Sequence, residues 1–316
     1  MTLLLAACGV RSASPPAPQA ADPPRETSAM SSTAAHADTS IEMSNVNIHL
    51  DPQLIVSIRR LSGHLVPTKQ GQAASFDDKR SYVIATSSAE IAVSMASMTR
   101  LMNAYVFGDE DAPLKNLELS IENGQLRQKG ILRKGPDVPF EMVAETSPTP
   151  DGRIRIHPRH LKAAHLPVKG LMKLFGVEMA KVINTRHTRG ITVDDNDIIL
   201  DPAVALPPPS LRGRITAIRI EGDQLVQTFG EGKPAPPSVP ASNYMAYRGG
   251  VLRFGKLTMN DTDMRLIDAN PADPFEFFPD RYKDQLVAGY SKTTPAGGLL
   301  VYMPDFGKIS KPRPSD

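Results

Sequence analysis

Three histidines stand close together in the segment HPRHLKAAH, at His157, His160 and His165. Imidazole nitrogens bind metals and act as general bases, so a metal enzyme or a hydrolase is one hypothesis for this chain. The spacing of three and then five residues crosses Pro158 at an apparent strand–helix junction, and no single face would present all three rings. We therefore expect no metal site here, and a hydrolase would need these rings to converge with a carboxylate in one pocket.

Other catalytic and cofactor signatures are absent or incomplete. Asp194-Asp195-Asn196-Asp197 resembles part of a calcium loop but lacks the central glycine and the closing glutamate, so a solvated β-turn is the better interpretation. Gly230-Glu231-Gly232 begins like a dinucleotide-binding loop, but Pro234, Pro236 and Pro237 exclude the helix that must follow. No G-x-S-x-G, S-x-x-K, H-E-x-x-H or Walker A motif occurs. We predict a protein that is not an enzyme, with no catalytic residue and no cofactor.

Cys8 is the only cysteine in the 316 residues, which excludes an intramolecular disulfide and a multi-cysteine metal site. Leu5-Ala6-Ala7-Cys8 matches a bacterial lipobox, in which the cysteine is diacylated and becomes the new N-terminus after cleavage. A signal of this kind also contains a basic segment and a longer apolar one, so this interpretation requires residues upstream of Met1. A short apolar terminus with a chance cysteine is the alternative. We predict lipid attachment at Cys8, in a signal remnant over residues 1–8.

Residues 9–40 are rich in Ala, Ser, Pro and Thr. This composition buries too little apolar surface to offset the entropy of ordering, so we expect a disordered tether. A coil of about thirty residues spans roughly 30 Å. Acyl chains on Cys8 would hold the protein on a membrane facing the periplasm. Gly9, where an aspartate would stand in lipoproteins kept at the inner membrane, favours the outer membrane.

Composition limits the partners. The net charge of +2 is too small to attract nucleic acid as a bulk electrostatic partner, so we expect none. After Cys8 no apolar run approaches the roughly 20 residues of a membrane helix. The 13 methionines suit either an irregular core or an adaptable apolar cavity. The sequence identifies no protein partner.

Apolar residues at helical spacing predict helices over 52–65, 88–107 and 168–183, with Ser88 as the cap of the second. The last two are rich in methionine, and their apolar stripes either pack in the core or line a lipid cavity. If they line a cavity, the groove-lining candidates are Ile91, Met95, Met98, Met102, Leu171, Met172, Phe175 and Met179.

Alternating apolar and polar residues predict strands through most of the remaining chain. Hairpin turns are indicated at Asn123-Gly124 and Gly222-Asp223. We predict an α+β fold, a long curved antiparallel meander around long amphipathic helices. Residues 41–232 would form this domain, 233–242 a proline-rich linker, and 305–316 a disordered tail. The β-rich segment 243–304, with a helix over 279–290, would complete the same sheet or form an added piece.

A basic run without acidic residues extends from 152 to 177. A solvated face is one interpretation. The other is contact with anionic lipid headgroups, which contribute about 1 kcal/mol per charge near a membrane surface. The headgroup or membrane-contact candidates are Arg153, Arg155, Arg159 and Lys162.

Residues 46–229 as a whole resemble a known family. Early in this block stands the segment Asp51-Pro52-Gln53-Leu54-Ile55-Val56. A strand and a long helix over 81–107 follow, and then a meander and a second long helix. The block closes with PPPSLRGRITAIRIEGDQLVQTF over 207–229. This pattern is similar to the bacterial LmeA-like phospholipid-binding family, which belongs with the tubular lipid-binding (TULIP-like) proteins. The resemblance implies a curved sheet around a long helix, with lipid acyl chains in an apolar groove between them.

Three functions compete. The first is a membrane-anchored periplasmic lipoprotein that binds or shuttles a phospholipid or other acyl-chain lipid, which requires an apolar groove larger than side chains can fill. The second is an envelope scaffold or assembly factor of the same fold, whose core is closed and whose sheet edges bind partners. The third is the histidine-based hydrolase or metal enzyme. We favour the first.

Overall fold

The computed structural model describes residues 38–133, 137–163, 188–231 and 241–309. These residues belong to a compact unit that extends from His36 to Asp316. Strands make up 58% of the structure and helices 12%, so the predicted fold of long helices wrapped by a sheet is wrong: the protein is mostly β-sheet with short helices.

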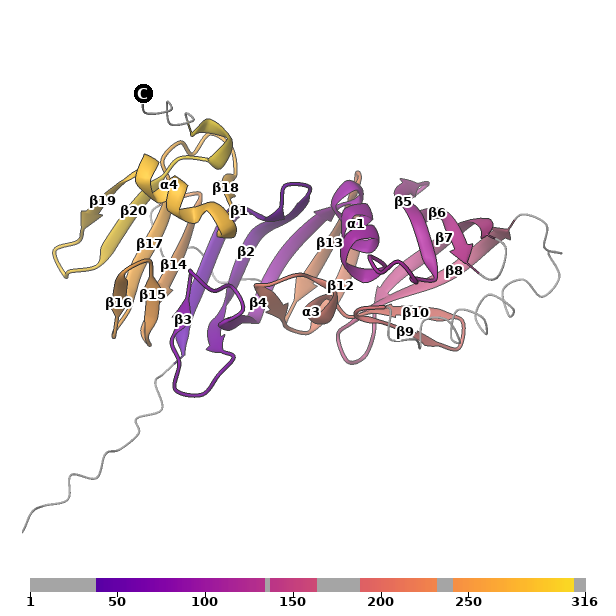
Figure 1. Ribbon diagram of the computed structural model, residues 1–316, viewed down its shortest axis with the longest axis horizontal. Helices are drawn as coiled ribbons and strands as arrows, with labels where there is room; N and C mark the ends of the chain where they lie inside the picture. Colours follow the sequence, from indigo (N-terminus) through magenta and orange to yellow (C-terminus); the bar gives the residue numbers. More distant parts are fainter. Residues whose placement is uncertain (1–37, 134–136, 164–187, 232–240, 310–316) are drawn as a thin grey trace, which may run out of the picture. The chain divides into compact units, whose positions relative to one another are not determined.

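The largest sheet has eleven strands in the order β12-β13-β4-β2-β1-β14-β17-β20-β19, with β11 paired to β4 and β18 to β1 (Figure 1). The central β1, β2 and β4 are long and antiparallel, and β14, β17, β20 and β19 continue the sheet beyond β1. Its strands are β1 (Thr39–Asp51), β2 (Leu54–Pro67), β4 (Tyr82–Ser94), β11 (Ser210–Arg212), β12 (Ile215–Glu221), β13 (Gln224–Phe229), β14 (Tyr244–Arg248), β17 (Asp263–Asp268), β18 (Phe275–Phe277), β19 (Tyr290–Thr293) and β20 (Leu299–Met303).

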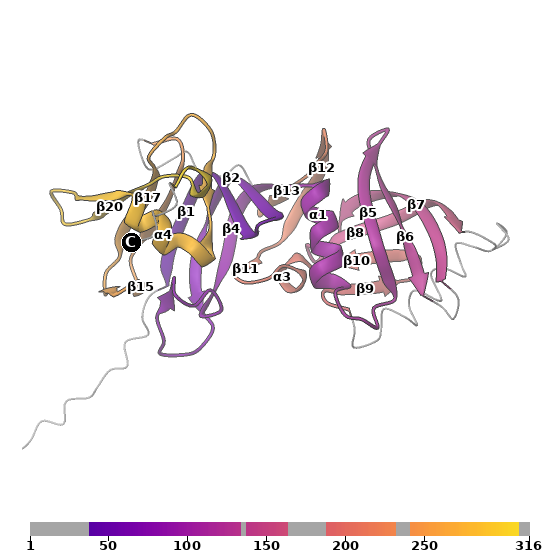
Figure 2. The same cartoon turned by 45° about the horizontal axis from the view of Figure 1, so that its top comes forward.

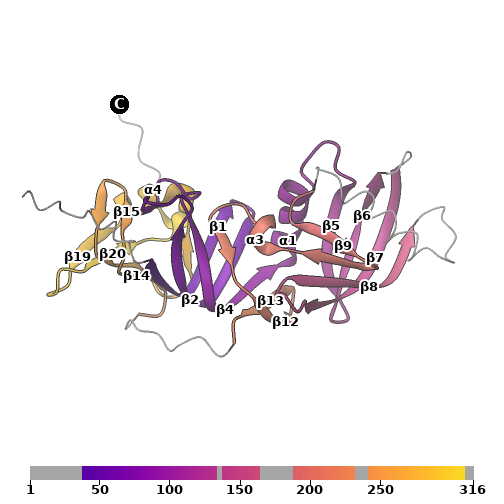
Figure 3. The ribbon, with the colours of Figure 1, turned by 90° about the horizontal axis from the view of Figure 1, so that it is seen from below.

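A second sheet has six strands in the order β5-β6-β7-β8-β10-β9. Figure 2 shows β10 between β8 and β9, and Figure 3 shows β8 and β9 of the same sheet from below. Asn123 and Gly124 both have positive φ at the predicted β5–β6 turn, the conformation that a two-residue hairpin needs. One face is apolar and buried, and the other is polar. The strands are β5 (Leu114–Glu122), β6 (Gln125–Arg133), β7 (Asp137–Pro148), β8 (Ile154–Ala163), β9 (Ile191–Asp194) and β10 (Asp197–Leu200).

The remaining elements are short. A three-stranded sheet contains β3 (Ala74–Ser75), β15 (Leu252–Phe254) and β16 (Leu257–Met259). The helices are α1 (Met95–Leu101), which continues as a π-helical turn over Met102–Val106, then α3 (Pro202–Ala205) and α4 (Tyr282–Ala288), with single 3-10 turns at Pro279–Arg281 and Phe306–Lys308. Among the described residues, every helix falls short of the length and apolar character that a membrane span requires.

The predicted helix over 52–65 is strand β2. A register shift between Ile58 and Arg60 marks a β-bulge against β4. The extra residue places a step of three residues, and not two, between the buried side chains of Ile58 and Leu61. As a result Leu54, Ile58, Leu61 and Leu65 repeat at steps of four, three and four residues. That is also the spacing of one helix face, which explains the error.

The first part of the predicted helix over 88–107 belongs to a strand, and only the second part is helical. Strand β4 continues to Ser94 because it pairs with β2 on one side and β13 on the other. Helix α1 begins only at Met95, and its cap is Ser94, whose side chain accepts a hydrogen bond from the Ser97 amide. Ile91 therefore lies in a strand and not on the helix. The third predicted helix, over 168–183, lies outside the described residues.

Helix α1 packs against the six-stranded sheet, as Figure 2 shows beside β5. The side-chain amide of Asn103 donates to the Leu117 carbonyl at 2.7 Å and its oxygen accepts from the Leu117 amide at 2.9 Å. The hydroxyl of Thr99 accepts from the Leu119 amide at 3.0 Å. These bonds satisfy backbone groups where β5 departs from regular pairing, so α1 and β5 form one wall of the core.

Candidate functional site

A narrow apolar cavity, here called the apolar slot, opens among the two larger sheets and α1. Its free volume is about 20 Å³, which is room for about one water molecule. Strands β2, β4, β8, β10, β11 and β13 contribute to it, together with α1 and α3. The lining residues are Val56, Ile91, Val93, Met98, Leu101, Ile154, Leu200, Pro202, Leu206, Leu211, Gln227 and Phe229.

A larger and more polar hollow, here called the polar pocket, shares Pro202, Leu211 and Phe229 with the slot. Its volume is about 560 Å³. The three shared residues therefore have apolar surface on both hollows, at the ends of β11 and β13 and the start of α3. The other lining residues are Asp151, Gly152, Arg153, Asp201, Ala203, Val204, Arg212 and Gly213.

Two basic and two acidic residues line the polar pocket, Arg153 and Arg212 with Asp151 and Asp201. The guanidinium of Arg153 lies 2.8 Å from Asp151, and the Thr149 hydroxyl together with Arg153 lowers the pKa of the Asp151 carboxyl, which stays ionised and neutralises that arginine. Arg212 has no ion-pair partner among the described residues. The pocket therefore offers an arginine without an ion pair, with the Asp201 carboxylate in the same lining. Beside it lies apolar surface that includes Val204 at 46% exposure.

The structure brings some predicted site residues together and separates others. Ile91 and Met98 line the slot, and Arg153 lines the polar pocket. Met95 and Met102 are buried in the core and line neither hollow. The predicted groove residues Leu171, Met172, Phe175 and Met179 lie outside the described residues, as does Cys8.

The basic run is largely neutralised on the outer face of β8. Arg155 lies 3.8 Å from Asp197, and Arg159 lies 2.6 Å from Glu145. Lys162 has no ion-pair partner among the residues described and lines a shallow hollow with Lys129. Carboxylates that are distant in sequence thus cancel most of the positive charge that the sequence concentrates in this segment.

The histidines do not converge on a site. His157 and His160 lie on the outer, polar face of β8, where the Nδ1 atom of His157 lies 2.6 Å from Asp197 Oδ1. His165 lies outside the described residues. In the described ranges, neither His157 nor His160 belongs to a group of side chains spaced to hold a metal ion.

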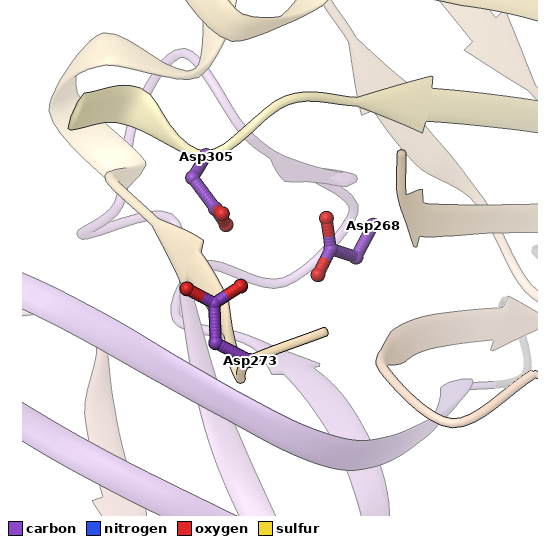
Figure 4. Close-up of side chains that lie close together, drawn as sticks. All are labelled: Asp268, Asp273 and Asp305. Carbon is purple, nitrogen blue, oxygen red and sulfur yellow. The ribbon is translucent and has the colours of Figure 1, made fainter. Parts of the chain in front are cut away.

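One cluster of carboxylates does have metal-like spacing. The ligand atoms of Asp268, Asp273 and Asp305 lie within 4.8 Å of one another, and Figure 4 shows the three side chains pointing toward a common centre. Lys308 Nζ lies 2.8 Å from Asp305 Oδ2 and 3.1 Å from Asp273 Oδ1. Asn243 donates to Asp268, whose pKa is raised by burial. The lysine supplies positive charge to Asp273 and Asp305, so it connects the last turn to the segment between β17 and β18.

Most lining residues of the slot and pocket were missed from the sequence, and two of them, Arg212 and Gln227, carry polar groups that the site depends on. Arg212 stands in a short strand after three prolines and carries no motif. Gln227 occupies an inward position between Leu225 and Phe229, so its only signal was a polar residue where the alternation expects an apolar one.

Comparison with models of known protein families found no match. Searches of curated proteins and of solved structures likewise found no similar protein. The resemblance to the LmeA-like family therefore stays a prediction.

Proposed function

We propose that this protein binds an acyl-chain lipid with an anionic headgroup and catalyses no reaction on it. The observation that carries the proposal is the shared wall of Pro202, Leu211 and Phe229, which joins an apolar slot to a polar pocket. The pocket lining includes Arg212, which has no ion pair with any residue that the structure describes. A bound lipid would place its headgroup near Arg212 and its chain in the slot.

The slot must widen to accept a chain, because about 20 Å³ is less than an alkyl chain occupies. Met98 and Leu101 of α1 are the side chains best placed to move. Methionine is unbranched and adapts its shape easily, and the π-helical turn that follows α1 is a local departure from regular helix geometry. Eight buried methylenes would contribute about 6 kcal/mol toward binding.

The location of the protein is part of the same proposal. Acylation at Cys8 and a tether over residues 9–40 would keep the binding domain within reach of a membrane from which it takes or to which it delivers lipid, on the periplasmic side and preferentially at the outer membrane. The closed state of the slot favours a second candidate, an envelope scaffold of this fold that never opens.

A bromine-quenching experiment separates the two candidates. The chain contains no tryptophan, so Phe229→Trp introduces a single fluorophore at the shared wall. This variant and its control are made in the full chain with Cys8→Ser, which removes the anchor. They are mixed with vesicles of phosphatidylglycerol that is brominated along its acyl chains.

Quenching of the Phe229→Trp fluorescence, weakened by Arg212→Glu, is the expected result. The matched control is Tyr290→Trp, on the exposed edge strand β19, whose fluorescence should not be quenched. Equal quenching at both positions would mean surface adsorption, and none at either would favour the scaffold.

A further inference from the structure

Of the described residues that line the apolar slot, Gln227 is the one with a polar side chain. It lies opposite Ile91 of β4 and only 5% of its surface is exposed. The described residues offer its side-chain amide no hydrogen-bond partner. The other eleven lining residues are all apolar, so none of their side chains can provide one.

A primary amide has two donor hydrogens and a carbonyl oxygen that accepts. Burying such a group without a partner is unfavourable, and an apolar residue of similar size would avoid the loss. The slot has room for about one water, which can bond to the Gln227 amide in the empty protein. Gln227 thus places a polar group on the slot where Leu225 and Phe229, on the same face of β13, are apolar. A ligand oxygen in the slot would satisfy the amide.

The position of Gln227 matches a particular part of a lipid. Phe229 borders both hollows, and Gln227 lies two residues along β13, about 7 Å away at the usual rise of a strand. The lining thus changes from Arg212 in the polar pocket, through the shared Phe229, to Gln227 and Met98 in the slot. In a glycerophospholipid the phosphate, the ester carbonyls and the alkyl chains follow in the same order.

We propose that the Gln227 side-chain amide donates a hydrogen bond to an ester carbonyl of the bound lipid. The slot would then select ester-linked acyl lipids over ether-linked lipids with the same headgroup and chains. This inference rests on the proposed function, since it assumes that a lipid chain enters the slot. It adds the chemical class of the ligand, ester-linked lipids, and names Gln227 as the residue that selects it.

The test compares dioleoyl phosphatidylglycerol with its diether analogue, which lacks both carbonyls. The full chain with Cys8→Ser is incubated with an equimolar mixture, and native mass spectrometry measures the ratio of the two complexes. The expected preference for the diester is about tenfold, equivalent to about 1.4 kcal/mol. Gln227→Leu should reduce the preference to within twofold.

Gln128 of β6 is a matched control, because it is also a buried glutamine, at 7% exposure, and does not line the slot. Gln128→Leu should keep the tenfold preference. Gln227→Met serves if the leucine variant does not fold.

Each outcome decides a separate point. Binding of both lipids without preference overturns the role of Gln227 and leaves lipid binding intact. A preference that persists in both Gln227 variants also overturns that role. Binding of neither lipid overturns the proposed function, and this inference with it.

Discussion

Gly230 tests whether the wall formed by β4 and β13 is packed as described. It follows Phe229, its φ is +74°, and its amide donates to the Arg214 carbonyl at 2.9 Å. A Cβ atom added at this position would lie 2.0 Å from the Ser87 carbonyl oxygen, on β4. Gly222, in the β12–β13 turn, has a similar φ of +61°, and an added Cβ there would meet nothing within 4 Å.

Alanine substitutions at these two glycines separate the cost of backbone strain from the cost of steric overlap. A left-handed alanine costs about 1–2 kcal/mol at either position. At Gly230 the overlap must also be relieved by moving the end of β13 away from β4. That movement breaks the bond to Arg214 and the one that the Thr216 hydroxyl donates to the Gly230 carbonyl at 2.7 Å, each contributing about 1 kcal/mol. We expect Gly230→Ala to cost about 3–4 kcal/mol in total.

Urea denaturation of the two single variants measures the difference. Gly222→Ala should lower the free energy of unfolding by about 1–2 kcal/mol and Gly230→Ala by about twice as much. Gly230→Ala should also weaken lipid binding, because the displaced residue adjoins Phe229. Equal losses in the two variants would refute the packing of β13 on β4.

Three further predictions concern other parts of the chain. Hydrogen bonds from Arg59 and Arg219 lower the pKa of Glu221 from 4.5 to about 2, so these ion pairs stabilise the fold fully above pH 4.5 and less as the pH falls toward 2. Glu221→Gln should therefore reduce the fall in melting temperature between about pH 6 and about pH 3. An unchanged fall would contradict the assignment. Met98→Ala should lower the free energy of unfolding of the lipid-free protein, measured in urea, by about 2–5 kcal/mol. Because the substitution enlarges the slot, it should also increase lipid occupancy in native mass spectra. Lower occupancy in a folded variant would contradict the placement of the lipid chain. Cys8→Ser should move the protein from the membrane fraction to the soluble fraction of the cell, and a distribution like that of the wild type would exclude acylation as the anchor.

Local turn chemistry was readable from the sequence. Asn123-Gly124 and Gly222-Asp223 mark hairpins because few other residues accept positive φ, and this preference depends on adjacent residues alone. The helix predictions failed where strand pairing decided the outcome. The bulge in β2 reproduced helical spacing, and β4 is a strand because two neighbours pair with it across gaps of many residues.

In the candidate site, too, the residues were predicted one by one, and their arrangement depended on contacts between distant segments. Met98 and Ile91 were chosen as members of one helix stripe, yet they meet at the slot from a helix and a strand. Arg153 was chosen for a basic run, but Asp151 neutralises it, whereas Arg212 has no ion pair within the described part of the chain. Which arginine keeps its charge depends on contacts between distant segments, and a single sequence does not display them.

The most direct test of lipid binding is native mass spectrometry of the full chain with Cys8→Ser, purified from a bacterial host without detergent. We predict a mass shift that disappears on denaturation and releases an acyl lipid, with an occupancy that Arg212→Glu reduces. A bare protein mass, unchanged after incubation with phosphatidylglycerol vesicles, would contradict lipid binding and leave the closed scaffold as the better account.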